Sequence, residues 1–164
     1  MIRAPIILAC AVFLFGCDKK RTPSQYLIPS DYEGVVITIF NQPGFPGLPL
    51  VDGFRVHEYP DDGILITSSE QEFGWASDEV LDVFEDGTRR RLPVCHSGGR
   101  CERFSATGTH LDVSATEIVF YYKAVGSDEY WEGRDAREYD RKREEAVSKI
   151  ARTKQGNSKE GGTG

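Results

Sequence analysis

The sequence predicts a mainly β protein: an antiparallel β-sandwich, or a barrel-like sheet, followed by a C-terminal α-helix. Residues 32–40 and 117–123 are dense in β-branched and aromatic side chains, which favour strands. Turn signals built from Gly, Pro and Asp separate these and other short runs, a spacing typical of a sandwich or barrel. Residues 135–152 contain neither Gly nor Pro, which predicts a helix near the end of the chain.

The strand regions can be ordered along the chain. Residues 32–40 form a near-continuous apolar run, which predicts a strand buried on both faces, and the Pro- and Gly-rich residues 41–49 form a loop. Residues 54–59 and 64–67 flank the turn 60–63, which predicts a hairpin. A second hairpin is predicted from residues 80–84 and 89–94, because Asp86-Gly87 between them favours a tight turn.

A basic triplet, residues 89–91, lies in the second arm of that hairpin. It faces acidic residues of the first arm and the turn: Asp82, Glu85 and Asp86. Cross-strand pairing of opposite charges explains the triplet, and we favour this over the alternative of an anion-binding site.

The predicted helix carries a thin apolar stripe. The residues on it are Tyr139, Ala146, Val147 and Ile150. We expect a helix with so narrow an apolar face to pack weakly on the domain or to project into solvent.

Length and charge limit the classes of function. The chain has 164 residues, the size of one domain, and a formal net charge of −6. Residues 17–131 hold 10 basic and 19 acidic side chains, whereas residues 132–164 hold 9 basic and 7 acidic ones. An acidic domain of this kind excludes nucleic acid as its main partner, because phosphate binding needs an excess of Lys and Arg.

The N-terminus has the features of a secretion signal. One basic residue, Arg3, precedes an apolar run over residues 4–15, which suits a signal peptide and is too short to span a bilayer. The run ends at Leu14-Phe15-Gly16-Cys17, which resembles the lipobox of bacterial lipoproteins. The resemblance implies that Cys17 becomes the lipidated mature N-terminus, with diacylglycerol and acyl chains such as palmitate. The alternatives are a plain cleaved signal peptide or an apolar N-terminal strand.

These features divide the chain into five parts. Residues 1–16 are the predicted signal peptide and residues 17–24 the lipidated N-terminus and tether. Residues 25–131 form the β-sandwich domain, residues 132–154 the charged helix, and residues 155–164 a disordered tail without apolar side chains.

The predicted location is the cell envelope. Asp18 after the cysteine favours the inner membrane facing the periplasm, and the outer membrane is the alternative.

Two cysteines remain for the folded domain. Cys95 and Cys101 are separated by five residues, and in an oxidising envelope such a pair predicts one disulfide. A metal site from Cys95, His96, Cys101 and His110 is the alternative, although the spacing matches no common zinc pattern. Free thiols are the third possibility. We expect neither a metal nor a cofactor beyond the acyl chains on Cys17.

Few other residues are candidates for chemistry. Alternation places His57 on the face opposite Val56, where a surface histidine is the simplest interpretation. An acidic-aromatic loop surrounds Trp75 with Glu70, Glu72, Asp78 and Glu79. Such a loop could hold calcium or a sugar, but the simplest interpretation is a solvated loop with Trp75 tucked into the core. Large apolar residues in loops often mark contact sites. The candidates for contact with a partner are Phe45, Leu48, Phe73 and Trp75.

One ordered set of motifs resembles a known family. The motifs are Ile28-Pro29-Ser30-Asp31-Tyr32-Glu33-Gly34, Phe40-Asn41-Gln42-Pro43-Gly44, Asp52-Gly53 and Tyr59-Pro60-Asp61-Asp62-Gly63-Ile64-Leu65-Ile66-Thr67-Ser68-Ser69. They resemble a family of bacterial lipoprotein-type domains of unknown function. The resemblance implies a β-rich envelope domain and carries no catalytic residue. At the level of fold, the opening strand is also similar to carboxypeptidase-regulatory and transthyretin-like sandwiches.

The predicted function is that of a membrane-anchored lipoprotein, a non-enzymatic binding or structural module of the cell envelope. Its expected partners are the lipid bilayer, through Cys17, and an envelope protein or polymer. The alternatives are a small envelope hydrolase that uses His57 or the acidic loop, and a metal-binding lipoprotein. We assign no catalytic residue, because the sequence lacks a recognisable catalytic motif.

Overall fold

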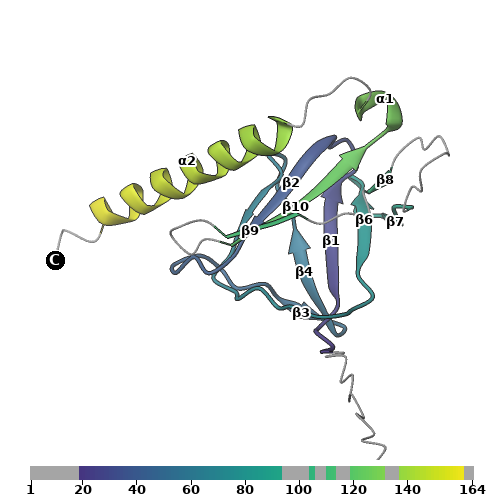
Figure 1. The fold of residues 1–164 in the computed structure, drawn as a ribbon, viewed down its shortest axis with the longest axis horizontal. Helices are drawn as coiled ribbons and strands as arrows, with labels where there is room; N and C mark the ends of the chain where they lie inside the picture. The colour runs from purple at the N-terminus through teal and green to yellow at the C-terminus, as the bar shows by residue number, and fades with distance from the viewer. Residues whose placement is uncertain (1–18, 94–103, 106–109, 114–118, 132–136, 161–164) are drawn as a thin grey trace, which may run out of the picture.

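The computed structural model describes residues 19–93, 104–105, 110–113, 119–131 and 137–160. Within these residues the chain folds into two packed β-sheets with a long helix against the second (Figure 1). The first sheet has the order β3 (Leu50–Val51), β4 (Phe54–Glu58), β1 (Ser24–Pro29), β6 (Glu79–Val83) and β7 (Arg89–Arg91). The second has the order β5 (Ile64–Ile66), β2 (Gly34–Ile39), β10 (Val119–Gly126) and β8 (Phe104–Ser105), and β9 (His110–Val113) also pairs with β10.

The predicted sandwich followed by a helix is confirmed, but the sheets are mixed and not purely antiparallel. β1 pairs in parallel with both β4 and β6, and β2 pairs in parallel with β5. Parallel neighbours cannot be joined by a tight turn, so the chain must leave the sheet between them. It does so by crossing to the other sheet: β2 follows β1 and β5 follows β4, and both belong to the second sheet.

This crossing makes one predicted hairpin wrong. The turn at residues 60–63 does not fold β5 back onto β4; it carries the chain from the first sheet to the second, where β5 pairs with β2. Gly63 allows the change of direction, since its φ is 66° and its amide donates to the Pro60 carbonyl at 2.7 Å. Ile64 and Ile66 are buried in the second sheet, in one cluster with Ile37 and Ile39 of β2.

The second predicted hairpin is confirmed as β6 and β7, and of the predicted charge pairs across it the one to Asp82 is confirmed. Asp82 lies opposite Arg90 in the register, and the Arg90 guanidinium donates to the buried Asp82 carboxylate at 3.0 Å. Arg91 pairs with Glu79 at 3.6 Å. Glu85 and Asp86 lie in the turn, where Asp86 accepts hydrogen bonds from Thr88. The basic triplet therefore has two structural partners on the neighbouring strand.

β2 is buried along its whole length, as its continuous apolar sequence predicts. Alternate side chains point to opposite faces of a strand. Val36 faces the core between the two sheets, while Val35, Ile37 and Ile39 face the helix. The strand therefore belongs to two hydrophobic clusters, one on each side of the second sheet.

The helix covers the outer face of the second sheet. α2 (Arg137–Glu160) follows the short α1 (Asp128–Trp131) and places Ala146 and Ile150, both buried, on the β2 side chains. The Lys149 ammonium donates to the Asp62 carboxylate at 2.6 Å. We expected weak packing from the thin stripe, but Ala146 lets the helix approach closely, so a few apolar residues suffice.

α2 extends further than the sequence predicts. Its carboxyl-terminal part runs beyond the sheet (Figure 1) and remains helical to Glu160, although we expected disorder from residue 155. Once a helix is nucleated, each further residue that becomes fixed adds one hydrogen bond, so extension is easier than nucleation. In the part of the chain that the structure describes, no helix is both long and apolar enough to cross a membrane.

Candidate functional site

The parallel strands give the domain two distinct ends. β4, β1 and β6 are neighbours that run in the same direction, so their amino termini share one edge of the sheet and their carboxyl termini the other. Residues 19–23 enter at the amino end, shown at the bottom of Figure 1. Each end has a surface hollow, and the two hollows differ in charge.

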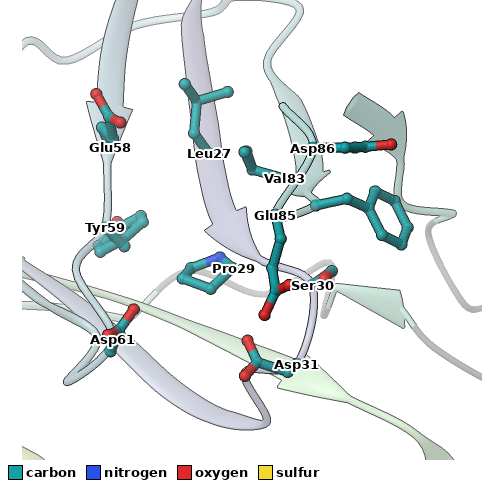
Figure 2. Close-up of a pocket in the computed structure, with 11 residues that line it drawn as sticks. Leu27, Pro29, Ser30, Asp31, Glu58, Tyr59, Asp61, Val83, Glu85 and Asp86 are labelled. Atoms are coloured by element: carbon teal, nitrogen blue, oxygen red, sulfur yellow. The ribbon is translucent and has the colours of Figure 1, made fainter. Parts of the chain in front are cut away.

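The hollow at the carboxyl end is acidic. It has a volume of about 710 Å³, and its lining includes the apolar side chains of Leu27, Pro29, Val83 and Phe84. Its five charged lining residues are all acidic: Asp31, Glu58, Asp61, Glu85 and Asp86. Figure 2 shows these side chains around the ends of the strands that supply Glu58, Leu27, Pro29 and Val83. An apolar floor with an acidic rim suits a cationic ligand with some apolar surface.

Backbone hydrogen bonds hold the three strand ends of this hollow together. The Ser30 amide donates to the Val83 carbonyl and the Tyr59 amide donates to the Leu27 carbonyl, both at 3.0 Å. At the turn, hydrogen bonds from Thr88 lower the pKa of Asp86, which keeps this carboxylate ionised. The acidic residues of the rim are therefore carried by strand ends that are hydrogen-bonded to one another.

His57 lies on the inner face of the first sheet, so the prediction of a surface histidine is wrong. Its side chain is 2% exposed, its Nδ1 is 3.2 Å from the Thr38 hydroxyl, and its ring centroid is 4.6 Å from that of Tyr26. The alternation was predicted correctly, but the face of β4 that carries His57 turns toward the second sheet. Burial, with smaller contributions from Arg55 and Arg21, lowers the pKa of His57 to about 3.

This placement leaves His57 without access to a substrate. It lines neither of the two hollows, and a neutral, desolvated imidazole with so low a pKa is a poor general base near neutral pH. Its role in the described structure is to pack and to hydrogen-bond between the sheets.

At the amino end, the structure brings together the two loops proposed for contact with a partner. The Asn41 amide donates to the Ser69 carbonyl at 3.0 Å, and the Ser68 amide donates to the Pro46 carbonyl at 3.2 Å. The Leu48 amide donates to the Ser69 hydroxyl oxygen at 2.8 Å. Loops that are more than 20 residues apart in the sequence therefore form one surface.

The four proposed contact residues divide into two pairs. Phe45 and Leu48 are half-buried and pack against the two hydrophobic clusters, so they mainly cover the core. Phe73 and Trp75 are exposed, and the expectation that Trp75 is tucked into the core is wrong. Two further exposed apolar residues, Leu50 and Val51, lie at the end of the loop over residues 41–51, which we predicted from the sequence as a contact region with Phe45 and Leu48 as its named residues.

The second hollow lies at this amino end. It has a volume of about 610 Å³ and includes Leu50 and Phe73 in its lining. Four of its charged lining residues are basic, namely Lys19, Lys20, Arg21 and Arg55, and two are acidic, namely Glu70 and Glu72. Its balance of charge is therefore the reverse of that at the carboxyl end.

Residues 19–23, which we expected to act as a tether, lie against the domain. The Trp75 amide donates to the Lys19 carbonyl at 2.9 Å, and the Arg21 amide donates to the Trp75 carbonyl at 3.1 Å. The Arg21 guanidinium pairs with Asp78 at 2.5 Å, and the Thr22 amide donates to Glu72 at 3.0 Å. The acidic loop is thus engaged in holding the N-terminal segment.

This engagement bears on the hydrolase and metal alternatives. Glu72 also pairs with Arg55 at 3.2 Å, so both Glu72 and Asp78 already have cationic partners. Among the described residues, no three His, Cys, Asp or Glu side chains are grouped so that they could hold a metal ion. Cys17, Cys95, His96 and Cys101 lie outside these residues, and only the backbone of His110 is described. Lipidation and the disulfide therefore stay predictions.

Fold and surfaces together define a small two-sheet β-sandwich with a covering helix and an oppositely charged hollow at each end. The chain belongs to a family of unknown function, DUF6843, whose model matches residues 20–158. The resemblance to a family of unknown function is confirmed, whereas the transthyretin-like similarity stays a prediction.

A solved structure shares this fold. It is that of a putative lipoprotein from Bacillus anthracis. The TM-score is 0.60 and the sequence identity is 25%, and the alignment covers 79% of this chain and 94% of the other. No curated protein matches the chain.

Proposed function

We propose that this protein is a lipid-anchored, non-enzymatic binding module of the bacterial cell envelope. Acyl chains on Cys17 hold it at the membrane, and the acidic hollow at the carboxyl end receives a cationic segment of an envelope protein or polymer. The observation that carries the proposal is the opposite placement of the two ends. The chain enters beside Lys19 at the amino end, while the hollow opens at the other edge of the same three parallel strands.

The opposite placement matters because an anchor and a binding site on the same end would compete for space. With Cys17 only two residues before Lys19, the amino end of the domain is turned to the bilayer. The acidic hollow then faces away from the membrane, where a partner can reach it. The carboxylates on its rim also stay away from anionic lipid headgroups, which would repel them.

Two further observations support a lipoprotein. The chain has the Leu14-Phe15-Gly16-Cys17 motif after an apolar run, and the Bacillus anthracis neighbour is named as a lipoprotein. That neighbour also favours a location in the cell envelope. The hydrolase alternative has less support, because His57 is buried and the acidic loop is occupied by Arg21 and Arg55.

The anchor is tested on protein purified from bacterial membranes. Mass spectrometry of the N-terminal peptide should find acyl chains on Cys17 and no residue before it. The Cys17→Ser variant should lose the lipid and leave the membrane fraction. Cys10→Ser is the matched control, and it should be processed normally because Cys10 lies within the predicted signal peptide. An unmodified Cys17 in the membrane protein would refute the anchor.

The hollow is tested with a defined cationic probe, a short lysine-rich peptide, by calorimetry. We expect the double variant Asp31→Asn/Glu85→Gln to bind it about tenfold more weakly than the wild type, because two rim carboxylates are lost. The control Glu70→Gln/Glu144→Gln removes the same charge from exposed sites outside this hollow and should bind as the wild type does. Equal weakening in both double variants would show a general charge effect and would argue against the hollow.

A further inference from the structure

Exposed apolar side chains gather at the amino end of the domain. Among the described residues, five large hydrophobic side chains are exposed, and four of them lie at this end: Trp75 at 75%, Leu50 at 67%, Phe73 at 56% and Val51 at 50%. Leu50 and Phe73 line the same hollow, and Val51 follows Leu50 in β3. We call these four residues the amino-end patch. A cluster of exposed apolar side chains of this kind marks a surface that contacts a membrane or another protein.

The N-terminal segment is fixed beside the patch. Main-chain hydrogen bonds join Trp75 to Lys19 and to Arg21, at 2.9 Å and 3.1 Å. The contact is so close at Gly74 that a Cβ there would lie 2.0 Å from the Lys19 carbonyl oxygen. Gly74 also has a φ of 138°, which other residues rarely adopt. The direction in which the chain leaves the domain is therefore set by the loop that carries Trp75.

The length of chain between the anchor and the patch is short. Cys17 precedes Lys19 by two residues, and two residues span at most about 7 Å even when fully extended. The backbone of Cys17 therefore lies within that distance of Lys19, and its acyl chains keep Lys19 near the surface of the bilayer. Because Lys19 is hydrogen-bonded to Trp75 and lines the same hollow as Leu50 and Phe73, the patch lies next to the point at which the chain reaches the headgroups.

From this geometry we infer that the amino-end patch is a second membrane contact, made by the folded domain itself with the surface of the bilayer that holds the anchor. The inference rests on the proposed lipidation of Cys17. Trp75 and Phe73 lie among the headgroups, where aromatic side chains are favoured, and Leu50 and Val51 lie beside them.

The charges near the patch agree with this orientation. Lys19 and Lys20 are exposed beside it and attract anionic lipid, while Arg21 and Arg55 are paired with acidic residues of the loop. The exposed carboxylate of Glu70 opposes the two lysines in part. The opposite end presents only acidic side chains among its charged lining residues, so a bilayer containing anionic lipid favours the amino end.

The test uses the lipidated full chain in vesicles of phosphatidylcholine and phosphatidylglycerol, prepared with and without bromine on the acyl chains near the headgroups. Bromine quenches only tryptophans that touch the bilayer. Subtracting the emission of the Trp75→Phe variant removes the contribution of Trp131. We expect the remaining Trp75 emission to shift to shorter wavelength on reconstitution and to fall about twofold in brominated vesicles.

Two variants check the geometry behind this expectation. Gly74→Ala should displace the N-terminal segment from the loop and reduce the quenching of Trp75, while the chain stays lipid-anchored. Val147→Ser removes an exposed apolar side chain from α2 and should leave the quenching unchanged. Circular dichroism shows whether each variant keeps its fold. Unchanged quenching in a folded Gly74→Ala variant would contradict the role of the docked segment.

The inference and the proposed function fail in different ways. If mass spectrometry finds lipid on Cys17 but Trp75 emission is neither shifted nor quenched, the anchor stands and the membrane contact of the domain is refuted. If Cys17 carries no lipid, both are refuted. Quenching that is equal in vesicles with and without phosphatidylglycerol would retain the apolar contact and overturn the contribution of Lys19 and Lys20.

Discussion

Burial of His57 makes the stability of the domain depend on pH. The ring lies between the sheets, 3.2 Å from the Thr38 hydroxyl, and its pKa is lowered from 6.5 to about 3 by desolvation first, with Arg55 and Arg21 adding to the effect. The unfolded chain takes up a proton on His57 below pH 6.5, whereas the folded chain does not. The contribution of His57 to the free energy of unfolding is therefore fully present above pH 6.5 and is lost as the pH drops toward 3.

The size of this loss follows from the two pKa values. Each pH unit between them contributes about 1.4 kcal/mol, so at pH 5 the domain should be about 2 kcal/mol less stable than at pH 7.5 through His57 alone. The perturbation is His57→Asn, which keeps an amide oxygen near the Thr38 hydroxyl and removes the titrating group. We expect the variant to be less stable at pH 7.5 and to lack this part of the pH dependence.

Urea unfolding followed by circular dichroism between pH 7.5 and 5, at constant ionic strength, measures the effect. His96 and His110 are present in both proteins, so the difference between the two stability curves isolates His57. The difference should narrow by about 2 kcal/mol as the pH falls to 5. Parallel curves for the wild type and His57→Asn would refute the reasoning, because they would show that His57 titrates alike in the folded and unfolded chains.

Three further outcomes are expected. Gly63→Ala should lower stability by about 1 to 3 kcal/mol, measured by urea unfolding, because its φ is 66° and a Cβ would lie 2.3 Å from the Tyr32 hydroxyl oxygen; an unchanged midpoint would contradict this. Ile150→Ala should cost about 2 to 4 kcal/mol, since the side chain is buried against β2; a loss below about 0.5 kcal/mol would mean that the helix does not dock. Thiol counting on the denatured, non-reduced protein should find neither Cys95 nor Cys101 free, and two free thiols would refute the disulfide.

Local patterns in the sequence predicted those features that depend on neighbouring residues. The apolar run of β2 predicted a strand buried on both faces, because a strand with one face in solvent alternates apolar and polar residues. The Asp86-Gly87 turn specified the β6–β7 hairpin with its Arg90–Asp82 pair, because a tight turn fixes the register of the arms that it joins.

Features that depend on which layer a strand joins were not predictable in this way. The turn at residues 60–63 looks like a hairpin turn, but whether it returns the chain to the same sheet depends on what covers Ile64 and Ile66. The helix that covers them comes about 80 residues later in the sequence. The face of His57 was mispredicted for a similar reason: alternation gives two faces, and only the second sheet decides which of them is the inside.

For the candidate sites, too, the sequence predicts the residue types and the tertiary structure sets their positions. The sequence by itself determined the composition of this protein's surfaces: an apolar leader before Cys17, an acidic domain, and loops rich in Pro, Gly and aromatic residues. Only the tertiary structure decided their positions. Three parallel strands sent the acidic residues that follow them to one end of the sheet, and placed Trp75, Leu50 and the segment leading to Cys17 at the other. The physical reason is that pairing strands that are distant in the sequence sets a common direction, which no local pattern encodes.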